Sequence, residues 1–178
     1  MAHHHDKNRY ALAVGHIAIE WNYLERDLQR LAHHYLDIDE ETATHIFAYM
    51  GNASRAEFTE WLAERFEDNA ALKEHVVHFI AVFCRLRANR NIVEHGVPAL
   101  TRDGAFLGEI VKLSRRDGDM PFAASQATLD TFMKHLRSAR AYAIAIQSAQ
   151  VDSNLTAALV KPMMPKRMKP TAQRTEEP

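Results

Sequence analysis

Apolar residues between positions 10 and 35 recur at alternating steps of four and three residues. This heptad spacing gathers them on one face of a helix, so we predict a helix that starts after Asp6 or Asn8 and ends near Asp37. An apolar stripe of this length needs a partner helix along its whole length, from the same chain or from a second copy. The stripe consists of Tyr10, Val14, Ile17, Trp21, Leu24, Leu28, Leu31 and Tyr35.

Two later segments show the same alternation of steps. Asn69 can cap the first of them and Gly96 can end it, whereas Ser125 or Thr128 can start the second. Three long helices with such stripes and short connections predict an up-and-down helical bundle. The two stripes consist of Leu72, Val76, Phe79, Phe83, Leu86, Arg90 and Val93, and of Leu129, Phe132, Leu136, Ala139, Ala143 and Ile146.

Two shorter helices are predicted between the first two long ones. Asp39 can cap a helix that runs through Met50, with Gly51 as its stop. The sequence Ser54-Arg55-Ala56-Glu57 matches a capping box and predicts the start of the other short helix. This second helix carries large apolar side chains that we expect, like Trp21, to pack in the core: Phe58, Trp61, Leu62 and Phe66.

The sequence pattern after Gly96 is no longer helical, because Pro98 disfavours a helix and runs typical of extended strands follow. Pairs of Asp and Gly separate these runs, and such pairs are typical of hairpin turns. We therefore predict a small β-hairpin or meander inserted between the last two long helices, and a short helical turn at 155–160. The runs cover 97–100, 105–113 and 120–122, and the turn pairs are Asp103-Gly104 and Asp117-Gly118.

The predicted fold class is all-α, a single helical domain over residues 6–160 with a small β-hairpin insertion. Residues 161–178 hold four prolines and five Lys or Arg residues without an apolar period, so we expect a disordered basic tail there. Its charge suits a polyanion, but a solvated end is the favoured interpretation. The run His3-His4-His5 resembles an expression tag, with a native origin as the alternative.

Composition and charge narrow the classes of function. The formal net charge of −1 argues against strong non-specific binding of nucleic acid, because such binding relies on an excess of Lys and Arg. No apolar run approaches the ~20 residues of a membrane span, and the polar N-terminal stretch lacks the pattern of a signal peptide. The single cysteine, Cys84, cannot form an internal disulfide. We therefore expect a cytoplasmic protein without a membrane partner.

Candidate chemistry concentrates near the end of the helix that carries Arg85, Arg87 and Arg90. Arg90 occupies a position where the stripe requires an apolar residue, which is costly unless its guanidinium is paired or reaches solvent. Asn91 and His95 are four residues apart and share one helix face. A cation, an amide and a histidine in one small region suit a phosphate: the arginine binds its oxygens, and the histidine moves a proton near neutral pH.

The stretch Arg90-Asn91-Ile92-Val93-Glu94-His95 resembles the Arg-(four to six residues)-His motif of the HEPN superfamily, in the form in which a polar residue follows the arginine. The resemblance implies a helical bundle whose homodimer brings two motifs into one cleft. It also implies a metal-independent endoribonuclease without a cofactor, as in toxins of toxin–antitoxin, anti-phage or stress-response systems, with an antitoxin or regulatory protein as partner. By this resemblance Arg90 holds the scissile phosphate of RNA. His95 acts as base or acid while the ribose 2′-hydroxyl attacks, and Asn91 positions the histidine or the phosphate.

A second interpretation is a non-catalytic dimerisation or protein-interaction module. In it Arg90 pairs with Glu94 or with an acid on another helix, and His95 helps to cap the last turn. Glu20 and Glu25 are the candidate acids on the first helix, although solvated or ion-paired roles of their own are favoured.

The remaining chemistry-bearing residues carry weaker signals. His75 and His78 are three residues apart, with Glu74 beside them, but no third ligand has a convincing spacing, and His33-His34 are adjacent and do not face the same way. We therefore predict no metal site. Cys84 lies in an apolar helix pattern, so we expect it to pack as a small apolar residue and not to act as a nucleophile.

Overall fold

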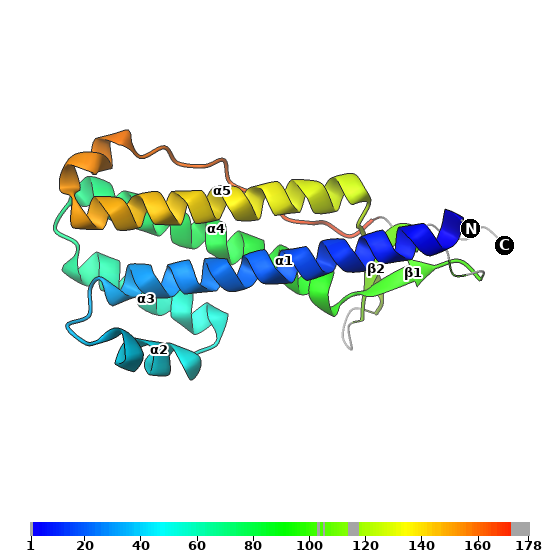
Figure 1. Ribbon diagram of the computed structural model, residues 1–178, viewed down its shortest axis with the longest axis horizontal. Helices are drawn as coiled ribbons and strands as arrows, with labels where there is room; N and C mark the ends of the chain where they lie inside the picture. Colours follow the sequence, from blue (N-terminus) through cyan, green and yellow to red (C-terminus); the bar gives the residue numbers. More distant parts are fainter. Residues whose placement is uncertain (1, 103, 105, 114–117, 172–178) are drawn as a thin grey trace.

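Helix α1 (Ala2–His33) runs along almost the whole molecule in the computed structural model (Figure 1). The structure describes residues 2–102, 104, 106–113 and 118–171, with side chains from residue 9 onward. The predicted apolar stripe of α1 faces inward against α3, α4 and α5 of the same chain. The stripe therefore finds its partner helices within one chain and does not need a second copy. Its fully buried members are Ile17, Trp21, Leu24, Leu28 and Leu31.

The other two long helices are α4 (Ala70–His95) and α5 (Gln126–Val151), and both begin at predicted caps. The Asn69 side chain accepts hydrogen bonds from the amides of Ala71 and Leu72, at 3.1 and 3.2 Å. The Ser125 hydroxyl accepts one from the amide of Thr128 at 3.3 Å. Both predicted stripes lie in the core, with Arg90 as the single member that is not buried. The helical bundle is thus confirmed.

The short helices α2 (Glu40–Ala48) and α3 (Asn52–Phe66) pack beside α1. Asp39 caps α2 as predicted, by accepting a hydrogen bond from the amide of Thr42 at 2.8 Å. The predicted start of α3 is wrong: the helix begins at Asn52, and its N-cap Gly51 has no side-chain cap. The earlier start has a tertiary cause. The side-chain amide of Asn52 donates a hydrogen bond to the Glu25 carboxylate of α1 and fixes the chain before Ser54.

The predicted packing role of the α3 aromatics holds only in part. Leu62 is buried, but Trp61 and Phe66 are 53% and 52% exposed. Trp61 stacks on Phe58, with ring centroids 6.0 Å apart. Phe58 packs against the small buried cluster of Ala32, Phe47 and Leu62, whereas Trp61 and Phe66 lie at the surface.

The predicted β insertion is a three-stranded antiparallel meander of β1 (Val97–Leu100), β2 (Phe106–Lys112) and β3 (Met120–Ala123), in the order β1-β2-β3. Ile110 pairs with Pro98 on one side and with Phe122 on the other. The buried Ile110 and Phe122 side chains join the helical core. Gly104 and Gly118 have φ of +85° and +71° as tight turns require, whereas Asp103 and Asp117 lie outside the described residues.

Gly96 marks a close approach between α4 and the sheet. A Cβ atom at this position would lie 2.6 Å from the carbonyl oxygen of Ile92 and 3.0 Å from the Cγ2 atom of Ile110. The Gly96 amide closes the helix by donating to the same Ile92 oxygen at 3.0 Å. A glycine is therefore needed for α4 to end against β2 with His95 as its last residue.

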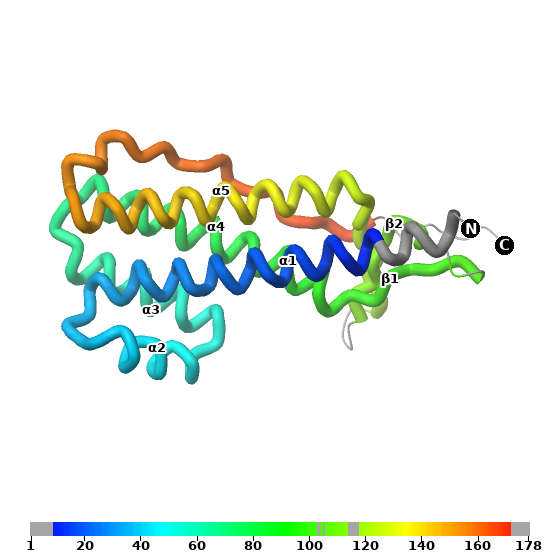
Figure 2. The backbone as a smooth tube through the Cα atoms, viewed as in Figure 1, coloured from blue at the N-terminus to red at the C-terminus, as the bar shows by residue number. Residues whose placement is uncertain are grey.

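The C-terminal segment 161–171, hereafter the strap, follows the short helix η1 (Ser153–Ala158) and returns along the bundle to the sheet (Figure 2). The structure differs here from the expected disordered tail. Pro170 forms an isolated bridge with Phe122, and the Thr171 amide donates to the carbonyl oxygen of Pro121 at 2.8 Å. Residues 172–178 lie outside the described residues.

Candidate functional site

Arg90 is held inside the bundle by an ion pair with Glu94, one turn further along α4. Its guanidinium carbon lies 5.9 Å from the ring centroid of the buried Trp21. The side chains of Arg90 and Glu94 are 23% and 13% exposed. Of the acids considered from the sequence, Glu94 is the one that pairs with Arg90.

Glu20 and Glu25 are engaged elsewhere. The Glu25 carboxylate accepts hydrogen bonds from the Trp21 indole and the Asn52 amide and lies 3.6 Å from the Arg55 guanidinium. Glu20 faces α5. Both acids are therefore structural links between helices, as the favoured interpretation of the sequence held.

The Arg90–Glu94 pair is incompletely satisfied. Arg90 Nη1 donates a long hydrogen bond of 3.4 Å to Asn91 Oδ1. Arg90 Nε and Glu94 Oε1 are buried atoms without a hydrogen-bond partner in the described part of the chain. Such atoms are rare in folded proteins, so the pair is held at a cost in hydrogen bonding.

His95 is exposed at the C-terminal end of α4. Within the described residues its side chain makes no hydrogen bond or ion pair, so the imidazole is open to a substrate. Asn91, one turn earlier, is half-buried. The structure thus brings Arg90 and Asn91 into contact and leaves His95 at the adjoining surface.

A cavity of about 620 Å³ opens on the Asn91 side of α4. We call it the cationic cavity, because Arg87, Lys112 and Arg167 contribute the charged side chains among its described lining residues. These cations come from α4, β2 and the strap, and none forms an ion pair in the described part of the chain. The remaining lining residues that matter below are Gly51, Asn52, Ala53 and Asn91.

Sequence reasoning identified only part of this cavity. Arg87 precedes Asn91 by one helical turn, so their shared face could be predicted. The positions of Lys112 and Arg167 at the cavity could not be predicted from the local sequence, because the meander and the strap bring them to α4 from distant parts of the chain.

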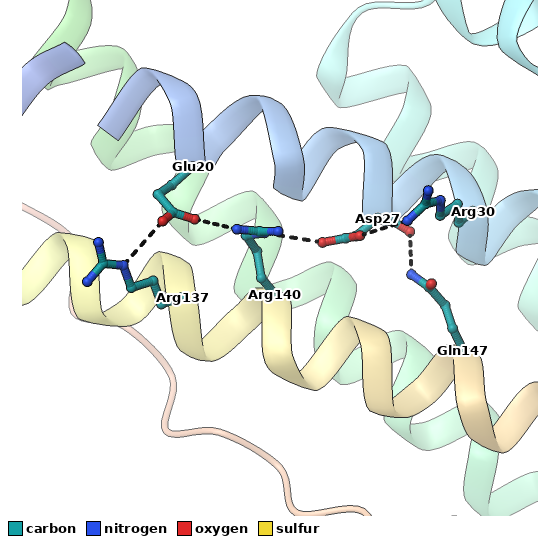
Figure 3. A network of polar contacts seen from close by, with 6 residues as sticks. All are labelled: Glu20, Asp27, Arg30, Arg137, Arg140 and Gln147. Atoms are coloured by element: carbon teal, nitrogen blue, oxygen red, sulfur yellow. Dashed lines mark hydrogen bonds and ion pairs between the residues drawn. The ribbon is translucent and has the colours of Figure 1, made fainter. Parts of the chain in front are cut away.

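A second polar cluster joins α1 to α5 (Figure 3). Glu20 pairs with Arg137 at 3.2 Å and with Arg140 at 2.6 Å. Arg140 also approaches the buried Asp27, with Nε 3.5 Å from Oδ2. Burial raises the pKa of Glu20, but hydrogen bonds and charge from the two arginines outweigh it and hold this pKa below its ordinary value. Burial dominates at Asp27 and raises its pKa despite Arg140.

The histidines considered as metal ligands have other partners. His75 Nδ1 lies 2.6 Å from the Tyr142 hydroxyl, and His78 Nε2 lies 3.0 Å from the carbonyl oxygen of Pro162. Among the described residues no three His, Cys, Asp or Glu side chains are grouped closely enough to hold a metal ion. Cys84 is half-buried against the core, and burial raises the pKa of its thiol. A raised thiol pKa disfavours the nucleophilic thiolate.

Comparison of the chain with protein families, with curated proteins and with solved structures gives no match. Within the described part of the chain, no helix combines the length and the apolar character that crossing a membrane demands.

Proposed function

We propose that this chain is a metal-independent endoribonuclease of the HEPN type that acts as a cytoplasmic homodimer, with Arg90, Asn91 and His95 as its catalytic residues. One observation carries the proposal: Asn91, inside the motif, lines a cavity whose described charged groups are all cationic. An RNA strand presents a row of phosphates that such a cavity complements. His95 stands exposed at the end of the same helix, where the strand can reach it.

The proposed reaction is an attack of the ribose 2′-hydroxyl on the neighbouring phosphorus. One His95 accepts the hydroxyl proton while the bond from O2′ to phosphorus forms and the bond from phosphorus to O5′ breaks. The second His95 of the dimer donates a proton to O5′. The products are a 2′,3′-cyclic phosphate and a 5′-hydroxyl, so protons and electrons balance without a metal.

Arg90 binds the phosphate oxygens in this scheme and balances the charge that grows in the transition state. Glu94 holds the guanidinium in place before RNA binds. The Arg90 side chain is 23% exposed, so a phosphate approaches the guanidinium from its accessible side and not at the buried Nε. Asn91 restrains the same guanidinium through its Oδ1 atom.

The resemblance to HEPN ribonucleases also suggests the biological role of the proposed enzyme. Such an enzyme acts as a toxin or as a component of an anti-phage or stress response. An antitoxin or another regulatory protein would then hold its activity in check by covering the motif of Arg90 and His95.

The Arg90–Glu94 ion pair itself favours a second candidate, a non-catalytic dimerisation or protein-interaction module. In this alternative the pair fixes the packing of α4 on Trp21 and has no substrate. His95 distinguishes the two functions, because an exposed structural histidine tolerates Gln whereas a proton-transfer residue does not.

The test is cleavage of a labelled RNA by the full chain in excess EDTA. We expect cleavage with 2′,3′-cyclic phosphate ends, abolished by a 2′-deoxy nucleotide at the cleavage site. His95→Gln should lower the rate by about 100-fold or more and leave the melting temperature unchanged. His45→Gln, at an exposed histidine of α2, is the matched control. Wild-type protein without cleavage, or a fully active His95→Gln variant, would leave the interaction module as the function.

A further inference from the structure

The cationic cavity is assembled where four segments of the chain meet. The start of α3, the last turns of α4, the sheet and the strap each contribute lining residues. Figure 1 shows the strap returning to the sheet, which follows the end of α4. The cavity is therefore a product of the tertiary fold and not a property of one basic stretch.

The charged side chains among the described lining residues of this cavity are all positive. Arg87, Lys112 and Arg167 share one cavity, and its described lining residues include no carboxylate. Like charges in one cavity repel one another, so the arrangement opposes folding unless an anion binds there. Arginine recognises phosphate through paired N–H groups, and lysine supplies a point charge.

The start of α3 adds backbone donors to the same cavity. Its N-cap Gly51 provides no side-chain hydrogen bond, so the first amides of the helix have no partner from a cap. Gly51, Asn52 and Ala53 line the cavity at this point. The positive end of the helix dipole thus reinforces the three cations.

Asn89 fixes the strap at the cavity. This buried side chain, 4% exposed, donates to the carbonyl oxygen of Lys166 at 3.0 Å and accepts from the amide of Met168 at 2.9 Å. Arg167 lies between the two hydrogen bonds. Its backbone is therefore held beside α4, although its side chain is exposed.

We infer that the cationic cavity binds backbone phosphates of the RNA strand next to the scissile bond, with Arg87, Lys112 and Arg167 as its cations. The inference rests on the proposed function, because Asn91 belongs to both the motif and the cavity wall. A strand that places one phosphate at Arg90 must continue past Asn91 into this cavity or away from it. The three cations favour the path through the cavity.

The test is binding of a fluorescent single-stranded RNA of about 12 nucleotides to the full chain carrying His95→Gln, so that cleavage is slow compared with the binding measurement. Arg167→Gln should weaken binding by about five- to tenfold and reduce the slope of log affinity against log salt by about 0.7. Arg87→Gln should do the same. Arg65→Gln is the matched control, since Arg65 is exposed at the far end of α3, about 20 Å from Asn52.

Unchanged RNA affinity in both Arg167→Gln and Arg87→Gln, with intact melting temperatures, would overturn the inference. Equal losses in Arg65→Gln would also overturn it, because binding would then follow net charge alone. Binding of inorganic phosphate without binding of RNA would overturn the RNA assignment. A separate outcome would refute only the proposed nuclease. If RNA binding depends on Arg167 but the wild-type protein does not cleave RNA, the phosphate-binding site stands and the enzymatic function is refuted.

Discussion

The α1–α5 interface and the cationic cavity differ in whether their charged side chains are paired. Between α1 and α5, Arg140 lies within ion-pair distance of Glu20 and Asp27 (Figure 3). Its guanidinium also lies over the Tyr23 ring, 4.4 Å from the ring centroid. In the cavity, Arg87 and Arg167 line the wall with no carboxylate among the described lining residues. One region uses charges to join two helices, and the other leaves them available.

This difference separates structural from functional charge. Removing one member of a half-buried ion pair strands its partner in a poorly solvated site, so stability falls. Removing an unpaired cation from a group of like charges leaves no buried charge without a partner, so the free energy of unfolding stays the same or rises. Stability measurements on matched variants can therefore sort the two regions without any assay of function.

The largest effect is expected at Arg140. Arg140→Met removes the cation between Glu20 and Asp27 and leaves Arg30, 3.9 Å away, as the remaining charged partner of the buried Asp27 carboxylate among the described residues. We expect a loss of about 2–3 kcal/mol in the free energy of unfolding, below the full cost of a buried pair because Arg140 is partly exposed. Urea titration followed by circular dichroism measures it.

Arg137→Met is the matched control in the same network. Arg137 also pairs with Glu20 but is 64% exposed, so its loss should cost less than about 1 kcal/mol. Equal losses for the two variants would contradict the structural role assigned to Arg140.

A smaller effect is expected at Asn89, which ties the cavity to the strap. Asn89→Ala removes two hydrogen bonds to the strap backbone and should cost about 1–2 kcal/mol. Amide exchange should rise most at Met168, whose N–H loses its acceptor. Hydrogen exchange read by mass spectrometry tests this, and unchanged protection of Met168 would show that the strap does not depend on Asn89.

The polar contacts inside the bundle also predict a pH dependence. Burial, followed by the charge of Lys161, lowers the pKa of His75, which also faces Tyr142, Glu74 and His78. The unfolded chain therefore binds more protons here, so this contribution to stability is complete above the ordinary histidine pKa of about 6.5 and declines below it. His75→Gln should flatten the fall in unfolding free energy between about pH 7.5 and about pH 5, whereas His16→Gln at an exposed position of α1 should not.

The smallest effect on stability is expected in the cationic cavity. Arg87→Gln and Arg167→Gln should each change the free energy of unfolding by less than about 0.5 kcal/mol, with stabilisation as the favoured sign because repulsion falls. Chemical denaturation of both variants measures this. A loss of more than about 1 kcal/mol at either position would mean that the arginine has a structural partner.

The three long helices could be predicted because their apolar stripes are local. Trp21, Phe83 and Ile146 occupy heptad positions, and each is fully buried. The caps Asp39, Asn69 and Ser125 also act within three residues of themselves. Local periodicity and local hydrogen bonding are thus sufficient for this part of the fold.

The misplaced features depend on distant partners. Ser54-Arg55-Ala56-Glu57 has the sequence of a capping box, but the contact of Asn52 with Glu25 starts α3 earlier. The strap has no apolar period, and it is held through Asn89 and Phe122, many residues away. Arg167 could not be assigned to a site for the same reason.

The division between chemistry at the motif and binding in the cavity is tested most directly by kcat and KM for RNA cleavage. His95→Gln should lower kcat by about 100-fold or more and leave KM near the wild-type value. Arg167→Gln should raise KM by about five- to tenfold and leave kcat within about twofold. Losses of kcat in both variants, or wild-type values in both, would contradict this division.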